Sequence, residues 1–350
     1  MQFRALLIQV LLLLVRTLHT LALPEREKSN HTKNVAVILS SSTFYHNYRH
    51  TANALAIYQS LKSHGRFTDD NIILMLADEI ACNAKNPFKE TIFPIGTHDL
   101  NFFDDVHVDY TGADVTVDNF FRVLLGRHDE YTPSYQRLPN VDENTNLFLY
   151  MTGHGGDSFF KFRDLEDFST KDLRGVFEQL QIMKRFNSIL FLSDTCQGFT
   201  TAPNTRIENE ESKTGMVLEN VYSVASSLKN ENSYSHHSDS SIGHSVMDRY
   251  VFNFVTYMGG FGPSATGKWQ EMDHLSLKSA MVDSMYHKGR SKLSANVGWS
   301  DLGCKRKMND VPLSDFLVMR QPSTSNEGET KVQEDNGIVL IEDYVDLFES

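Results

Sequence analysis

The chain has 350 residues, of which 40% are hydrophobic and 22% are charged. This composition is that of a globular protein and excludes a largely disordered chain. The formal net charge of −12 argues against a general nucleic-acid binder, which is usually basic, so we expect no nucleic-acid partner. The length suits one large α/β domain or two small ones.

The N-terminal segment is typical of a secretory signal peptide. Arg4 precedes a mostly apolar run, ALLIQVLLLLV (residues 5–15), which is short of the roughly 20 apolar residues of a spanning helix. Residues 21–23 (LAL) make an imperfect cleavage site, so residues 1–23 are either removed as a signal peptide or retained as an anchor. In both cases the chain enters the secretory pathway, where Asn30 in the sequon Asn-His-Thr is a candidate glycosylation site.

From residue 34 onward, short apolar runs alternate with amphipathic segments. The runs predict strands, and apolar side chains at helical spacing predict helices between them. The predicted strands are 34–40 (NVAVILS), 71–76 (NIILML), 147–152 (LFLYMT), 188–193 (SILFLS) and 221–225 (VYSVA); the predicted helices are 48–63, 117–125 (closed by Gly126), 171–184 and 247–258. Such alternation is typical of a largely parallel sheet covered by helices on both faces.

The remaining segments predict loops and a tail. Residues 91–109 and 259–274 have the mixed composition of loops, and no apolar run after the N-terminal one is long enough to cross a bilayer. We therefore expect one domain over residues 34–320, followed by a flexible acidic tail at 321–350.

A histidine and a cysteine directly follow two of the predicted strands. His154 lies in the sequence TGHGG after strand 147–152, and Cys196 lies in DTCQG after strand 188–193. Because ligands bind at the carboxyl ends of parallel strands, both side chains would share one edge of the sheet if these strands are neighbours. The glycines beside His154 leave room for something else to come close to the imidazole.

This pair points to nucleophilic catalysis. The thiolate is the reactive form of cysteine, and an imidazole beside Cys196 can hold the thiolate and then protonate a leaving amine. The backbone N–H of Gly155 can face a developing oxyanion. For each residue alone, a small buried cysteine or a turn histidine is the structural alternative. A metal site is a weaker interpretation, because neither residue has a CxxC or HxxxH companion.

The cysteine count is odd for a secreted chain. The only cysteines are Cys82, Cys196 and Cys304, and three thiols cannot all pair within one chain. At least one of them is therefore a free thiol or bonds to another chain, and a disulfide scaffold is excluded.

These motifs resemble those of the caspase-like cysteine peptidases, and more closely those of the asparaginyl-endopeptidase (legumain) group. The sequence FYHNYRHTANAL (44–55) matches that group's NYRH motif. The sequences ILMLADEIACN (73–83), VTVDNFFRVLLGR (115–127) and HSVMDRYVF (244–252), together with the form DTCQG, resemble one branch, the catalytic subunits of GPI transamidase. The resemblance covers roughly residues 34–320. It implies a caspase-like three-layer α/β sandwich in which helices flank a mostly parallel central sheet.

The resemblance implies a role for each matching residue. His154 would be the general base and acid, Cys196 the nucleophile, and Gly155 an oxyanion donor. Asn47 would orient His154 or help to hold the tetrahedral intermediate. The residues implied to lie at the substrate pocket are Arg49, Asp194, Ser233 and Asp248.

The resemblance also implies a partner and a possible ion. Cys82 lies where the catalytic subunits form a disulfide with a partner subunit, which would explain the odd cysteine count and leave Cys304 over. Members of the group can hold a calcium ion beside the sheet, and Asp69 and Asp109 are the matching acids; solvated surface acids are the alternative interpretation of both. The chemistry itself requires no cofactor.

The implied function is transamidation at the lumenal face of the endoplasmic reticulum. Precursor proteins would lose their C-terminal signals and be joined to the ethanolamine amine of a GPI lipid. Two departures from the family are the long, charged segment 199–220 and the lack of the C-terminal spanning helix found in many members, so membrane attachment would come from partner subunits. The alternatives are an asparaginyl endopeptidase, which shares the fold and the dyad, and a non-catalytic interaction subunit.

Overall fold

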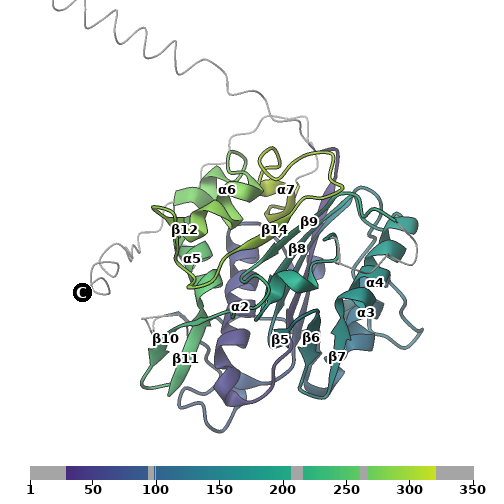
Figure 1. The fold of residues 1–350 in the computed structure, drawn as a ribbon. Helices are drawn as coiled ribbons and strands as arrows, with labels where there is room; N and C mark the ends of the chain where they lie inside the picture. Colours follow the sequence, from purple (N-terminus) through teal and green to yellow (C-terminus); the bar gives the residue numbers. More distant parts are fainter. Residues whose placement is uncertain (1–28, 94–97, 99, 206–215, 261–266, 321–350) are drawn as a thin grey trace, which may run out of the picture.

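A seven-stranded sheet forms the centre of the molecule (Figure 1). The computed structural model describes residues 29–93, 98, 100–205, 216–260 and 267–320. The strand order is β14-β9-β8-β4-β1-β2-β3, and the sheet is parallel except for β14, which runs antiparallel to β9. The strands are β1 (Lys33–Ser40), β2 (Ile72–Leu76), β3 (Tyr110–Thr111), β4 (Thr145–Thr152), β8 (Ser188–Asp194), β9 (Val221–Ala225) and β14 (Gly298–Ser300).

Helices cover both faces of this sheet. Successive side chains of a strand point to opposite faces, so Ala36 and Ile38 of β1 join one apolar cluster while Val35 and Val37 join the other. The first cluster includes α2 (Tyr48–Ser63), α5 (Arg249–Met258), α6 (Leu277–Met281) and α7 (Ser314–Leu317); the second includes α3 (Val117–Leu125) and α4 (Thr170–Ile182). The three-layer, mostly parallel α/β architecture implied by the resemblance is therefore confirmed.

Local sequence signals set the ends of the second pair of helices. The Thr116 side chain accepts a hydrogen bond from the N–H of Asn119 and starts α3, and Gly126 ends that helix in the left-handed conformation with φ 66°. Ser169 and Asp172 form a reciprocal capping box at the start of α4. These caps fix where each helix begins, and the buried side chains of each helix pack on the sheet.

Two small sheets near the carboxyl edge of the central sheet were not predicted. Three short antiparallel strands follow β4, and a hairpin precedes α5, which therefore begins at Arg249 rather than at residue 247. These strands are β5 (Gly155–Gly156), β6 (Phe159–Phe162), β7 (Glu166–Ser169), β10 (Ser235–Asp239) and β11 (His244–Asp248); a further hairpin pairs β12 (Tyr286–His287) with β13 (Arg290–Ser291). Each of these strands has at most five residues, which is too short for a clear two-residue alternation in the sequence.

Several expectations from the sequence concern residues outside the described ones. The signal peptide at 1–23 and the tail at 321–350 belong to this group. Over the ranges that the structure does describe, no helix combines the length and the apolar character needed to cross a membrane.

Candidate active site

His154 and Cys196 leave the central sheet from two neighbouring strands. β4 and β8 are parallel, and the last pair in their register is Thr152 with Asp194. Each reactive residue lies two positions beyond this pair along its own strand direction. The two strands are neighbours, as the sequence interpretation required, so the imidazole and the thiol start from the same edge of the sheet.

The catalytic candidate His154 is oriented by Asn47. Asn47 Oδ1 lies 3.0 Å from His154 Nε2. The amide nitrogen of Asn47 donates to the carbonyl oxygen of Thr43 at 2.7 Å, which turns Oδ1 toward the imidazole. Because Oδ1 can only accept, Nε2 carries the hydrogen and donates, and Nδ1 is left unprotonated. The imidazole is therefore held in the tautomer that can take a proton at Nδ1.

The Asn47 side chain makes this contact instead of capping helix α2. It occupies the N-cap position of α2, where an asparagine side chain usually accepts a hydrogen bond from the first turn. No side-chain capping bond is formed here, and the amide faces His154 instead. An N-cap side chain diverted toward a neighbouring histidine indicates that the position serves the site rather than the helix.

Burial keeps the imidazole of His154 neutral. Its half-buried position, followed by the positive charge of Arg49, lowers the pKa of His154 below the usual value of 6.5. A neutral imidazole at neutral pH can act as a general base.

The loop that carries Cys196 is held by a second loop. Gln197 adopts a left-handed conformation with φ 52°, its N–H donates to the carbonyl of Glu231 at 2.8 Å, and its side-chain oxygen accepts from the N–H of Asn230 at 3.0 Å. The hydroxyl of Ser227 donates to the carbonyl of Thr195 at 2.8 Å. The residues on both sides of Cys196 are thereby fixed, although the thiol itself is only half-buried.

Two backbone N–H groups beside the dyad are left out of the backbone hydrogen bonds around them. The N–H of Lys161 donates to the carbonyl of His154 at 2.9 Å, so the next pair of this antiparallel ladder, Gly155 with Phe160, is not hydrogen-bonded. The N–H of Gly155 therefore points away from β6. Among the described residues, the N–H of Cys196 makes no backbone hydrogen bond. Both N–H groups are therefore candidates for binding an oxyanion, and the sequence indicated only that of Gly155.

Glycine is required at position 155 by a close approach of the two loops. A Cβ atom there would lie 2.8 Å from Thr195 Oγ1 and 3.0 Å from the carbonyl oxygen of Phe159. The histidine loop and the cysteine loop are thus in direct contact through this glycine.

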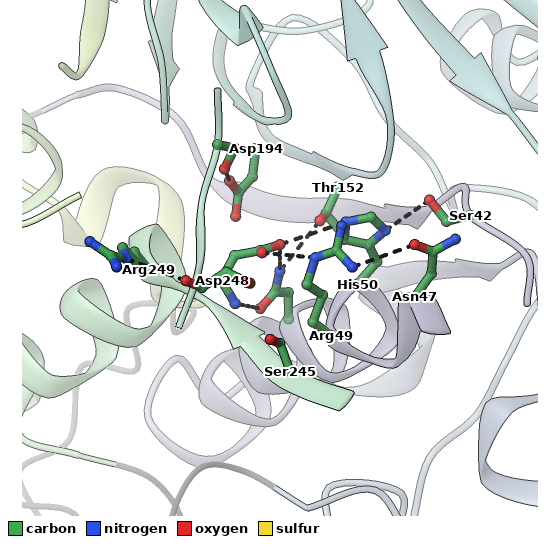
Figure 2. Close-up of polar contacts among 12 residues, drawn as sticks. Ser42, Asn47, Arg49, His50, Thr152, Asp194, Ser245, Asp248 and Arg249 are labelled. Carbon is green, nitrogen blue, oxygen red and sulfur yellow. Dashed lines mark hydrogen bonds and ion pairs between the residues drawn. The ribbon is translucent and has the colours of Figure 1, made fainter. Parts of the chain in front are cut away.

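Arg49 and Asp248, two of the pocket candidates, form an ion pair beside the dyad. Arg49 Nε lies 3.1 Å from Asp248 Oδ1 (Figure 2). The Asn53 amide donates to Asp248 Oδ2 at 2.6 Å. Asp248 is 3% exposed, and burial, together with the negative charge of Asp194, raises its pKa to about 7. The guanidinium of Arg49 thus pairs with Asp248, and its positive charge also acts to lower the pKa of Asp194.

Asp194 and Ser233, the other pocket candidates, are also in contact. The hydroxyl of Ser233 donates to Asp194 Oδ1 at 2.9 Å, and the hydroxyl of Tyr150 donates to Oδ2 at 3.3 Å. Asp194 is 1% exposed, and its burial raises its pKa. The structure thus brings the four pocket candidates together as two contacting pairs, which interact through the charges of Asp194 and Asp248.

His50 is a member of this cluster that the sequence reasoning did not single out. Its ring meets the ring of His154 edge to face with centroids 5.1 Å apart. Its Nε2 lies 3.7 Å from Asp248 Oδ2 (Figure 2). Its Nδ1 is 2.8 Å from the hydroxyl of Ser42. His50 links the dyad to the pocket acids, and its place three residues after Asn47 on the first turn of α2 was the available signal.

The two remaining cysteines differ in exposure. Cys82 is exposed at the end of a short 3₁₀ helix, Ile80–Cys82, whereas Cys304 is buried and its Sγ donates to the carbonyl of Val221 at 3.1 Å. Cys82 is therefore accessible to another chain, as an intermolecular disulfide requires, and Cys304 is not.

The two acids matched to a calcium ion interact with each other. Burial raises the pKa of Asp109 to about 7, and the charge of Asp69 adds to this effect. Asp109 is thus no solvated surface acid. Asp69 accepts from the Tyr58 hydroxyl and pairs with Lys62, whose ammonium already supplies a positive charge there. In the described part of the chain, no group of three or more His, Cys, Asp or Glu side chains could hold a metal ion. The residues present fit calcium poorly, so the ion stays a prediction.

Comparison with known proteins places this arrangement in a family. Residues 34–262 match the model of the peptidase C13 family. The chain is 40% identical over 262 residues to the GPI-anchor transamidase of Mus musculus, which covers 75% of this chain and 63% of that protein. It is 36% identical over 313 residues to the Homo sapiens protein of the same name (89% and 73%) and 38% identical over 309 residues to that of Schizosaccharomyces pombe (88% and 74%).

Among solved structures, one match has low similarity in both sequence and structure. Caspase-1 from Spodoptera frugiperda matches with a TM-score of 0.42 and 9% identity over 81% of this chain and 91% of that chain. The assignment instead rests on the sequence relatives, each of which shares more than a third of its aligned residues with this chain. The chain therefore belongs to the peptidase C13 family and, within it, to the GPI-anchor transamidases.

Proposed function

We propose that this chain is the catalytic subunit of a GPI-anchor transamidase. It cleaves the C-terminal signal of a precursor protein through a thioester at Cys196 and transfers the new C-terminus to the ethanolamine amine of a GPI lipid. The observation that carries the proposal is the register of β4 with β8, which delivers His154 and Cys196 to one edge of the sheet. The identity to curated GPI-anchor transamidases selects this reaction over plain hydrolysis.

The first half of the reaction breaks the precursor chain. His154 Nδ1 takes the thiol proton, and Cys196 Sγ bonds to the carbonyl carbon of the attachment-site residue. The N–H groups of Gly155 and Cys196 stabilise the oxyanion, a contribution worth about 3–4 kcal/mol per donor in known cases. His154 then protonates the amide nitrogen, the C–N bond breaks, and the signal peptide leaves with a free amine.

The second half joins the anchor. The amine of the GPI ethanolamine attacks the thioester carbon while His154 Nδ1 accepts a proton from the amine. The C–S bond breaks, the proton returns to Sγ, and an amide joins the precursor to the lipid. An orientation effect equivalent to about 10⁵ M or more is sufficient for an amine to compete with water.

The proposal is tested against the endopeptidase alternative by the fate of the thioester. The complex copurified with this chain is given a precursor with its C-terminal signal and hydroxylamine as a small amine. We expect the amine adduct to dominate over the free acid, because the amine is the natural acceptor. Rapid hydrolysis of an asparagine-containing peptide by the isolated chain, with no amine adduct from the complex, would instead identify an endopeptidase.

We further propose that Cys82 bonds to a partner subunit. Replacing Cys82 with serine should remove a species of higher mass from non-reducing gels while retaining part of the transamidation activity, because the thiol is exposed and distant in sequence from the dyad. The matched control is Cys304→Ser, which changes a buried thiol and should leave the high-mass species in place. Persistence of that species in the Cys82 variant would show that the bond lies elsewhere.

The proposed setting is the lumenal face of the endoplasmic reticulum, with partner subunits providing the attachment to the membrane. Asn30, which is exposed, remains a candidate glycosylation site. A structural calcium ion at Asp69 and Asp109 would have to displace Lys62 from Asp69, and no step of the reaction depends on it.

A further inference from the structure

The turn before α2 holds a phenylalanine in a backbone conformation that suits only glycine. Phe44 has φ 73° and ψ 141°, and its side chain is 59% exposed. A residue with a Cβ atom is strained in this region and stays there only when its surroundings hold it. Burial of the ring cannot be the restraint, since most of the side chain faces solvent.

The restraint is a hydrogen bond from the backbone of Phe44 to an acid. The N–H of Phe44 donates to Asp78 Oδ2 at 2.6 Å, which is the short distance of a bond to a charged acceptor. Asp78 is itself anchored, because the preceding N–H, that of Ala77, donates to the carbonyl of Ser40 at 2.9 Å. The backbone next to Asp78 is thus fixed to the end of β1, and the Asp78 carboxylate accepts the hydrogen bond from the strained turn.

The strained turn in turn positions Asn47. The carbonyl of Thr43 accepts from the Asn47 side-chain amide at 2.7 Å, and the carbonyl of Phe44 accepts from the Asn47 backbone N–H at 2.9 Å. These carbonyls lie on either side of the nitrogen that Asp78 binds. The Thr43 carbonyl belongs to the same peptide unit as that nitrogen, so rotation of the peptide would move the acceptor of the Asn47 side-chain amide and turn Asn47 Oδ1 away from His154.

We propose that Asp78 is a positioning residue for the catalytic histidine. It holds Phe44 in the strained conformation, the turn fixes Asn47, and Asn47 holds His154 with Nδ1 free for proton transfer. Asp78 lies in the sequence ADEIACN, a motif that the chemistry of the dyad leaves unexplained. The inference rests on the proposed role of His154.

The first test removes the carboxylate. The variant Asp78→Ala is made in the full chain and assayed as the purified complex with a precursor. We expect kcat for signal cleavage to fall about tenfold with little change in KM. The reason is that backbone strain of this size shifts the equilibrium between the strained and the relaxed turn by about one order of magnitude. Asp78→Asn should restore most of the rate, since the amide oxygen can still accept from Phe44. Glu79→Ala, which removes an adjacent exposed acid, is the matched control and should be unaffected.

The second test uses the strain itself. Phe44→Gly makes the left-handed conformation accessible without a restraint, so adding Asp78→Ala to Phe44→Gly should lower kcat by no more than about twofold. Equal losses in both backgrounds, or an unchanged kcat in Asp78→Ala, would overturn the positioning role. If His154→Ala also retained full activity, the proposed function itself would fail, and the two failures are thereby distinguished.

Discussion

Replacing Cys196 or His154 with alanine is expected to abolish GPI anchoring. Without the thiol there is no thioester, and without the imidazole neither proton transfer has a carrier, so signal cleavage should fall by about 10³-fold or more. Cells that carry only these variants should accumulate precursors with uncleaved C-terminal signals. The measurement is surface display of an anchored reporter together with the mass of its precursor.

The structure supplies controls for this experiment. Cys304→Ala removes a thiol that is buried against Val221, away from the carboxyl edge, and should leave anchoring in place at some expense in stability. The double variant of Cys196 and His154 should be no worse than either single variant, because the two groups act as one unit. Normal surface display in cells that carry only Cys196→Ala would refute the mechanism, and would favour the non-catalytic subunit.

Loss of Arg49 is expected to destabilise the fold and to do so more at high pH. The guanidinium is the cation paired with Asp248, and breaking a buried ion pair by removing one partner costs about 3–5 kcal/mol. In Arg49→Leu we therefore expect the free energy of unfolding to fall by about 3 kcal/mol at pH 8. The exposed part of the Arg49 side chain, 21%, keeps the value at the lower end of that range.

The sign of the pH dependence follows from the raised pKa of Asp248. Its folded value is about 7 and its ordinary value is 3.8, so between these limits the folded state keeps a proton that the unfolded state has lost. Stability therefore falls as the pH rises through this interval. Arg49 lowers the pKa of Asp248, so its removal raises that pKa further and extends the fall to higher pH. At pH 5, where Asp248 is largely protonated, the loss in Arg49→Leu should be smaller than at pH 8.

Thermal unfolding at the two pH values checks this result. Adding Asp248→Asn to Arg49→Leu removes the unpaired charge and should recover most of the stability lost at pH 8. A loss that is equal at both pH values, with no recovery in the double variant, would mean that Arg49 acts through packing alone.

The strand-helix pattern and the dyad could be predicted from sequence because both depend on local signals. Apolar runs such as 34–40 directly indicate buried strands. His154 and Cys196 each follow such a run, and because the two strands are neighbours both residues lie at one edge of the sheet. The contact of Gly155 with Thr195 could not be predicted, since it joins loops from different strands at a distance set only by packing.

Other parts of the site depend on long-range pairing. Asp248 meets Arg49 across 199 residues of sequence, and its serine- and histidine-rich hairpin carries no strand signal of its own. The strain at Phe44 is likewise invisible in sequence, because an exposed phenylalanine beside a tyrosine gives no indication of a positive φ. Such features appear where function overrides local preference.

The short segment between Asp78 and Cys82 has a consequence for assembly. At one end, Asp78 accepts a hydrogen bond from the turn that orients His154. At the other end, Cys82 exposes the thiol that we expect to form a disulfide with a partner subunit. Tethering the exposed end would reduce the conformational freedom of the whole segment. Turnover by a chain with an intact dyad would then depend on whether its neighbour is attached, so that full activity arises only after the complex has formed.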